Sequence, residues 1–110
     1  MSEAVAAMIW CPFPDMESAR TAAAQLVEER LIACGNIIPR VESVFRWKGA
    51  IETASECGLL CKTDTVTLQK AITRLESLHP YETPAIMALP VSAAPPATLG
   101  WLAEQLQGGD

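Results

Sequence analysis

The segment IIPRVESVFRW, residues 37–47, decides the fold, because its side chains alternate with a period of two. This alternation predicts a β-strand with one drier and one wetter face, longer than the common strand length of about 5–6 residues. Pro39 near its start is tolerated only at a sheet edge or a β-bulge. The drier face is expected to carry every second residue of the segment, namely Ile37, Pro39, Val41, Ser43, Phe45 and Trp47.

A second strand is expected directly after the first. Lys48 and Gly49 supply a turn, and residues 51–63 return antiparallel, so the two segments form a long β-hairpin. Strands rise about 3.3 Å per residue, so this hairpin overruns a small domain and its far end needs a partner. Half of the chain is hydrophobic, which leaves apolar surface for another copy of itself. We therefore expect a homo-oligomer.

The residues before the hairpin predict a strand and a helix. Residues 5–11 form a short, almost wholly apolar run that is typical of a central strand covered on both faces. Asp15 is a suitable N-cap for a helix over residues 16–33. The apolar stripe of this helix is expected to be Ala19, Ala22, Ala23, Leu26, Val27 and Leu31.

The residues after the hairpin predict a helix, a strand and a last helix. Asp64 or Thr65 caps the second helix, His79-Pro80 ends it, residues 85–91 form a short strand, and Pro95-Pro96 opens the last helix. The order β-α-β-β-α-β-α predicts one α+β domain, residues 1–110. Its first six elements match a ferredoxin-like βαββαβ sandwich, with two helices on one face of the sheet and the third helix as a C-terminal addition. The inward side chains of the two later helices are expected to be Leu68, Ala71, Ile72, Leu75, Leu78, Leu99, Leu102, Ala103 and Leu106.

Charge and hydropathy argue against two classes of partner, nucleic acids and membranes. The net charge is −5 and the eight basic residues are scattered, which argues against nucleic-acid binding. No apolar run approaches the roughly 18 residues of a membrane span. The N-terminus lacks the basic start of a signal peptide, so we expect a cytoplasmic protein. In that reducing compartment the four cysteines, with no C-x-x-C pair, are expected to be mostly buried small hydrophobes, and Trp10 and Trp101 to belong to the core.

The segment LHPYETP, residues 78–84, is the candidate functional loop. It holds the only His and the only Tyr of the chain, and its two prolines restrict the backbone around Tyr81 and Glu82. His79 and Glu82, with Cys34 brought near by the fold, would form a mixed nitrogen, oxygen and sulfur site suited to copper or zinc. The alternative is that His79 caps the second helix and Glu82 pairs across a subunit contact.

Other side chains have two readings each. Lys62 could neutralise an anionic ligand or pair with Glu56 or Glu82, and the ion pair is favoured. Trp47 could stack on a ligand, although an aromatic residue at a hairpin tip is more often an intersubunit anchor. On a strand, Cys57 and Cys61 lie about 13 Å apart, so one ion cannot bridge them within a subunit. We expect no catalytic residues, because no nucleophile motif, phosphate loop or H-E-x-x-H is present.

Four segments in order resemble the CutA family of divalent-cation tolerance proteins over nearly the whole chain. They are LVEERLIAC at residues 26–34, NIIP at 36–39, RWKG at 46–49 leading to Lys62-Thr63, and HPYE at 79–82 leading to Leu89-Pro90. The resemblance implies a ferredoxin-like fold, a homotrimer built through the long hairpins, and a likeness in architecture to the PII nitrogen-signalling proteins. It also implies a link to copper and divalent-cation tolerance.

The chain departs from the usual pattern of that family at several positions. Ala85 stands where the family usually has Glu, Phe45 where it usually has Tyr, and Thr98 where it often has Tyr. The presumed site therefore has one carboxylate and two phenol hydroxyls fewer. We expect a cleft between subunits, lined by His79, Tyr81, Glu82, Cys34 and Lys62, that binds copper(II) or another divalent metal not needed for folding. The alternatives are a PII-like signalling module with a small organic ligand and a protein partner, or a trimeric scaffold without a ligand.

Overall fold

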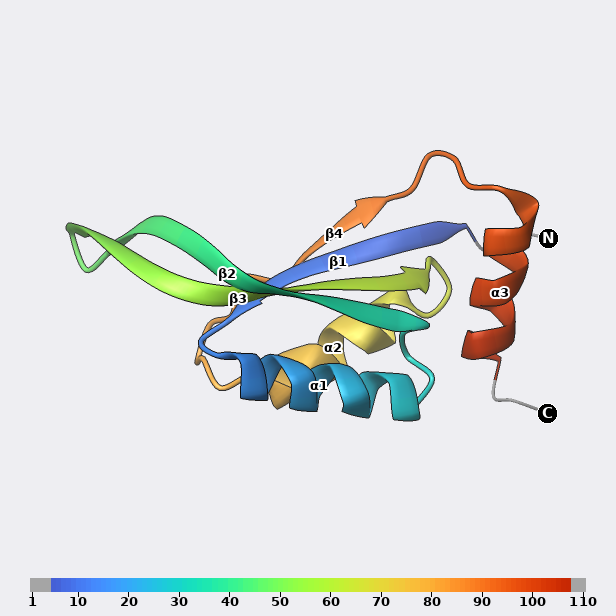
Figure 1. The fold of residues 1–110 in the computed structure, drawn as a ribbon, viewed down its shortest axis with the longest axis horizontal. Coiled ribbons are helices and arrows are strands. Elements are labelled where there is room, and N and C mark those ends of the chain that lie inside the picture. The colour runs from blue at the N-terminus through green and yellow to red at the C-terminus, as the bar shows by residue number, and fades with distance from the viewer. Residues whose placement is uncertain (1–4, 108–110) are drawn as a thin grey trace.

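The expected order of elements is confirmed by a computed structural model, which describes residues 5–107 (Figure 1). The four strands form one antiparallel sheet with the order β2-β3-β1-β4. The α+β sandwich is therefore as predicted. The elements are β1 (Ala6–Phe13), α1 (Met16–Glu28), β2 (Cys34–Trp47), β3 (Ala50–Asp64), α2 (Leu68–Leu78), β4 (Met87–Pro90) and α3 (Pro96–Leu106).

Helices α1 and α2 lie on the same face of the sheet, which we call the covered face (Figure 1). The side chains of Ile9 and Phe13 on β1 and of Leu59 on β3 point to this face and are fully buried. Leu26 of α1 and Leu75 of α2 are fully buried against them. Burying each such side chain contributes roughly 1.5–3 kcal/mol before entropic costs, so this layer is the core of the domain.

The opposite face of the sheet, which we call the open face, is covered by a helix of the described chain only at one end, where Leu102 of α3 packs against Ala6 and Ala33 (Figure 1). Paired residues of an antiparallel sheet share a face. Trp10 pairs with both Leu60 and Met87, and Met8 pairs with Leu89, so these five apolar side chains all lie on the open face. Met87 is 67% exposed and Leu89 53% exposed. The expectation that β1 is covered on both faces is therefore wrong for a single chain, and Trp10 is half-buried on this face.

Helix α1 starts as predicted and ends early. The carboxylate of Asp15 accepts a hydrogen bond of 2.7 Å from the backbone amide of Ser18, as an N-cap does. The helix stops at Glu28, not at residue 33, because Arg30 adopts a left-handed backbone with φ of 60° that a helix cannot contain. Val27, which was predicted to lie in the apolar stripe, is 43% exposed, and Leu31 packs on the core from the loop that follows the helix.

A β-bulge changes the phase of strand β2. Ile38 pairs with Gly58, but Val41 pairs with Glu56, so β2 contains one extra residue at Pro39 and Arg40. An extra residue reverses which face the following side chains occupy. Ile37 lies on the covered face, opposite Leu59, whereas Val41, Ser43, Phe45 and Trp47 lie on the open face. The predicted single face from Ile37 to Trp47 is therefore wrong, although the bulge is where proline allowed one.

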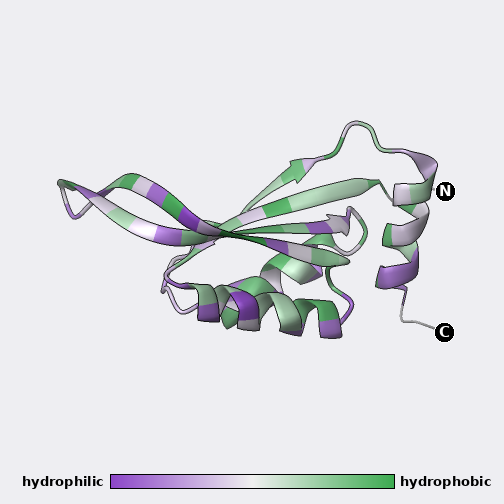
Figure 2. Ribbon diagram, in the orientation of Figure 1, coloured by the Kyte–Doolittle hydropathy of each residue, from purple (hydrophilic) through white to green (hydrophobic). Residues whose placement is uncertain are grey.

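Beyond the end of β1 the hairpin continues alone, and it gives the chain its longest extent of 48 Å (Figure 1). Lys48 and Gly49 form the tip with φ angles of 50° and 83°, which match a two-residue turn of type I′. Figure 2 shows hydrophobic and hydrophilic residues following one another along both strands. We call this part of the hairpin, residues 41–56, the arm. It exposes Val44, Phe45, Trp47 and Ile51.

The C-terminal elements are shorter or less buried than expected. Helix α2 begins at Leu68, and Asp64 accepts a hydrogen bond from the amide of Thr67 instead of capping the helix itself. Strand β4 covers only Met87–Pro90. In α3 only Leu102 is fully inward, while Leu99 is 39% and Trp101 40% exposed, so the expected core positions of these two residues are wrong. None of the helices within residues 5–107 is long and apolar enough to cross a membrane.

Candidate functional site

The loop from His79 to Ile86 lies where β1 ends and the hairpin leaves the sheet. His79 follows the last residue of α2 and is 8% exposed. Its ring stacks on Phe13, the last residue of β1, with ring centres 4.1 Å apart and planes inclined by 26°. Tyr81 also packs against the His79 ring, with ring centres 4.8 Å apart and planes inclined by 44°. The only His and the only Tyr therefore form one aromatic cluster against the end of β1.

Both ring nitrogens of His79 are engaged by backbone groups. Nε2 lies 2.8 Å from the carbonyl oxygen of Pro12, and Nδ1 lies 3.1 Å from the backbone nitrogen of Tyr81. The amide of Tyr81 can only donate and the carbonyl of Pro12 can only accept. The ring therefore carries its proton on Nε2, accepts at Nδ1, and is neutral. Burial lowers the pKa of His79, with the Pro12 hydrogen bond and Glu56 opposing, which agrees with a neutral ring.

Tyr81 connects the loop to the hairpin. Its hydroxyl donates a hydrogen bond of 2.7 Å to a carboxylate oxygen of Glu56 on β3. Burial and this hydrogen bond raise the pKa of Tyr81, so the phenol remains protonated and remains a donor. Glu56 lies one residue beyond Cys57, which pairs with Phe13 at the end of β1. The hydrogen bond is therefore made at the root of the arm.

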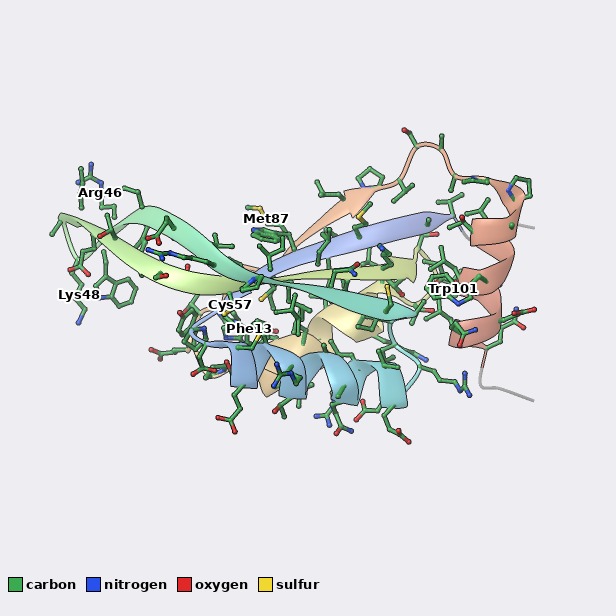
Figure 3. All side chains as sticks on the ribbon, in the orientation of Figure 1. Phe13, Arg46, Lys48, Cys57, Met87 and Trp101 are labelled. Atoms are coloured by element: carbon green, nitrogen blue, oxygen red, sulfur yellow. The ribbon has the colours of Figure 1, made fainter. Side chains whose placement is uncertain are left out.

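The thiol of Cys57 occupies the same root. Cys57 is buried and its Sγ lies 3.1 Å from the carbonyl oxygen of Pro39 in the bulge of β2 (Figure 3). Cys61 and Cys11 are fully buried on the covered face, and burial raises the pKa of each thiol to about 12. These three cysteines are buried as predicted, and the thiols of Cys11 and Cys61 are poor nucleophiles at neutral pH.

The three predicted metal ligands are not brought together within one chain. Within residues 5–107 no group of three or more His, Cys, Asp or Glu side chains is placed to hold a metal ion. Cys34 is half-buried at the start of β2, and its Sγ lies 3.9 Å from Asn36 Oδ1. Glu82 is exposed in the loop. A metal site made within a single chain by His79, Glu82 and Cys34 does not fit these positions.

The two remaining predicted residues lie apart from the loop. Lys62 is half-buried on the open face, in register with Cys34 and Met8. The ion pairs within the described chain are Arg40–Glu42 and Arg74–Glu29, so the expected pair of Lys62 with Glu56 or Glu82 is not formed there. Trp47 is 57% exposed near the hairpin tip, with the ammonium of Lys48 5.8 Å from its ring centre.

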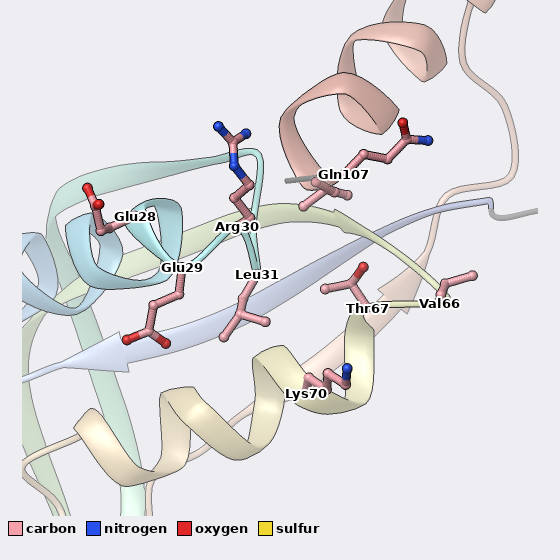
Figure 4. A pocket seen from close by; sticks show the side chains of 9 residues that line it. Glu28, Glu29, Arg30, Leu31, Val66, Thr67, Lys70 and Gln107 are labelled. Atoms are coloured by element: carbon pink, nitrogen blue, oxygen red, sulfur yellow. The ribbon is translucent and has the colours of Figure 1, made fainter. Parts of the chain in front are cut away.

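A cavity of about 560 Å³ lies elsewhere, where the end of α1, the start of α2 and the end of α3 meet (Figure 4). Four of its nine lining residues carry a charge. Two of them already have partners, because Arg30 donates to the carbonyl of Gln105 and Glu29 binds Arg74. Lys70 contributes a further cation and none of the predicted site residues lines this cavity. Sequence reasoning did not indicate it, since its residues come from three separate segments.

Comparisons with known proteins agree on one family. The sequence model described as CutA1 divalent ion tolerance protein matches residues 7–105. The divalent-cation tolerance protein CutA of Thermus thermophilus is 46% identical over 91 residues, which are 83% of this chain and 88% of that protein. The crystal structure of CutA1 from Ehrlichia chaffeensis has a TM-score of 0.90 at 30% identity, covering 96% of this chain and 98% of that chain. The periplasmic divalent cation tolerance protein CutA from Archaeoglobus fulgidus has a TM-score of 0.89 at 31% identity, covering 93% and 99%.

Proposed function

Because this chain belongs to the CutA1 divalent ion tolerance family, we propose that it contributes to divalent-cation tolerance as a homotrimer that takes up copper(II) weakly where subunits meet. The proposed assembly is like that of the PII nitrogen-signalling proteins. The role is non-enzymatic and cytoplasmic, as the sequence led us to expect. The metal is cargo, and folding does not require it.

The open face of the sheet is the observation that carries the assembly. Met8, Trp10 and Leu60 form a continuous apolar surface with the exposed side chains of Met87 and Leu89. A surface of this kind is costly in water and marks an interface. Another copy fits it best, since a closed ring of identical chains buries the same surface on every subunit.

The hairpin arm supports the same assembly. It extends past the end of β1 with Val44 70% and Ile51 69% exposed, and within one chain its two strands pair only with each other. An isolated two-stranded ribbon is marginally stable in water. Packing of the arm on a neighbouring subunit would stabilise it and would bury Trp47 and Phe45.

We assign the copper(II) donors to Cys34 of one subunit and Glu82 of another. Among the predicted ligands these two are less buried than His79, because Cys34 is half-buried and Glu82 is exposed. Since residues 5–107 of one chain gather no group of three such donors, we propose that a second chain completes the site. A site with so few protein donors is expected to be weak.

A native mass spectrum before and after addition of one equivalent of copper(II) per chain tests the proposal. We expect a mass of three chains that gains a defined number of copper ions. Cys34→Ser and Glu82→Gln should each reduce the copper gained, while Glu76→Gln, which removes an exposed carboxylate from α2, should not. A trimer that gains no copper, or gains it equally in all variants, contradicts the metal part. A single chain contradicts the assembly.

A further inference from the structure

We infer that His79 is a positioning residue of the hairpin arm, a neutral imidazole with its proton on Nε2, and that it is not a ligand of the divalent cation. The inference uses the contacts of one chain and does not rest on the proposed trimer or on the copper donors. It corrects the natural assumption that the only histidine of a divalent-cation tolerance protein binds the metal.

Both nitrogens of the His79 ring are occupied by hydrogen bonds. A histidine binds a metal through a ring nitrogen whose lone pair is free. Nε2 uses its proton on the carbonyl of Pro12, at 2.8 Å, and the lone pair of Nδ1 accepts the amide of Tyr81, at 3.1 Å. Metal binding at either nitrogen would therefore break a buried hydrogen bond and leave its backbone partner unsatisfied, which typically costs about 1–3 kcal/mol.

The His79 ring is also poorly accessible to a cation. The ring is 8% exposed, and Phe13 and Tyr81 each pack against it, with ring centres 4.1 Å and 4.8 Å away. Within residues 5–107 the ring belongs to no group of three metal-ligating side chains. The aromatic neighbours cover the ring, so little of it is left open to solvent or to a cation.

The His79 ring also holds the loop that carries Tyr81 in place. The bond to Pro12 ties the start of the loop to β1, and the bond from Tyr81 shapes the backbone two residues later. That shape directs the Tyr81 hydroxyl to Glu56, at 2.7 Å, at the root of the arm. The hydrogen bond from the Cys57 thiol to the carbonyl of Pro39 joins β3 to β2 next to Glu56. His79 therefore fixes, through Tyr81, the place from which the arm leaves the sheet.

Two side chains test this separation of roles. In His79→Gln the terminal amide NH₂ can still donate to the carbonyl of Pro12, but the imidazole is gone. Tyr81→Phe keeps the aromatic packing and removes only the bond to Glu56. We expect His79→Gln to take up as much copper(II) as the wild type and to retain most of the protection of the arm from hydrogen exchange. We expect Tyr81→Phe to lose protection at the root of the arm, at residues 52–57, without a change in copper uptake.

Nitrogen NMR of the labelled ring supplies a readout that a merely structural role would not move. We expect the Nε2–H tautomer both before and after copper(II) saturates binding, with ring signals that broaden no earlier than those of neighbouring residues. Paramagnetic broadening of the His79 ring ahead of other residues, or a loss of copper uptake of tenfold or more in His79→Gln with the trimer intact, would overturn the inference. A proton on Nδ1 would also overturn it. Absence of copper uptake by the wild type would contradict the proposed function and leave the tautomer measurement decisive.

Discussion

The two faces of the sheet differ in how far their apolar side chains are buried within one chain. On the covered face, Ile9 and Leu59 are fully buried by the helices of their own chain. On the open face, their neighbours Trp10 and Leu60 are half-buried and Met87 is 67% exposed. Both faces are apolar, but within residues 5–107 helices pack along the covered face and only on one end of the open face. Apolar composition alone therefore does not tell whether a strand is buried by folding or by assembly.

Leu59 and Leu60 offer the largest test of this difference, because they are adjacent on β3 and point to opposite faces. Leu59→Ala removes fully buried atoms and should cost about 2–5 kcal/mol in the free energy of unfolding. Leu60→Ala should cost less in unfolding and should weaken association of the chains. Denaturant unfolding and sedimentation, both measured over a range of protein concentrations, separate the two effects. Equal losses in unfolding at every concentration would show that the faces do not differ.

Gly58 tests the packing of the open face itself. A Cβ added at Gly58 would lie 2.7 Å from Cζ3 of Trp10 and would overlap the ring, so the indole lies directly on this glycine. Gly58→Ala should therefore displace Trp10 and cost about 1–3 kcal/mol. Gly100→Ala in α3 is the matched control, because a Cβ there meets nothing within 4 Å. That control should stabilise the chain by roughly 0.5–1 kcal/mol. Unchanged Trp10 fluorescence in Gly58→Ala would contradict this packing.

The pH dependence of stability tests the packing at the end of the covered face, where His79 stacks on Phe13. Burial lowers the folded-state pKa of His79 below its usual value of 6.5, so the unfolded chain binds this proton more readily. The contribution of His79 is present above about pH 6.5 and is lost as the pH falls through the lower, folded-state pKa. His79→Gln should show a shallower loss of stability over that window. The same slope in both proteins would mean that the folded ring is not kept neutral.

The tip of the arm should give the smallest effect, because it lies far from both faces. Lys48 adopts a φ of 50°, which a type I′ turn fills better with Asn. Lys48→Asn should raise stability by a few tenths of a kcal/mol. Lys48→Val, with a β-branched residue in the left-handed region, should lower stability, and thermal unfolding of the two variants compares them. A stabilised valine variant would argue against the turn type.

Sequence patterns predicted the hairpin, the order of elements, the N-cap Asp15 and the buried cysteines, because each of these depends on residues close together in the chain. The phase change in β2 was not predictable, because Pro39 permits a bulge without requiring one. The end of α1 was missed because Arg30, not a glycine, adopts the positive φ. The state of His79 depends on the carbonyl of Pro12, 67 residues away, and only the fold brings the two together.

The assembly state of a variant with charges on the open face tests the central claim most directly. Met87→Lys with Leu89→Lys places two charges on that face, whereas Val66→Lys places one at a 72% exposed apolar position next to α2. In sedimentation velocity we predict three chains for the wild type and for Val66→Lys, and a folded single chain for the double variant. Three chains in the double variant, with the same stability as the wild type, would contradict the claim that the open face is completed by other copies of the chain.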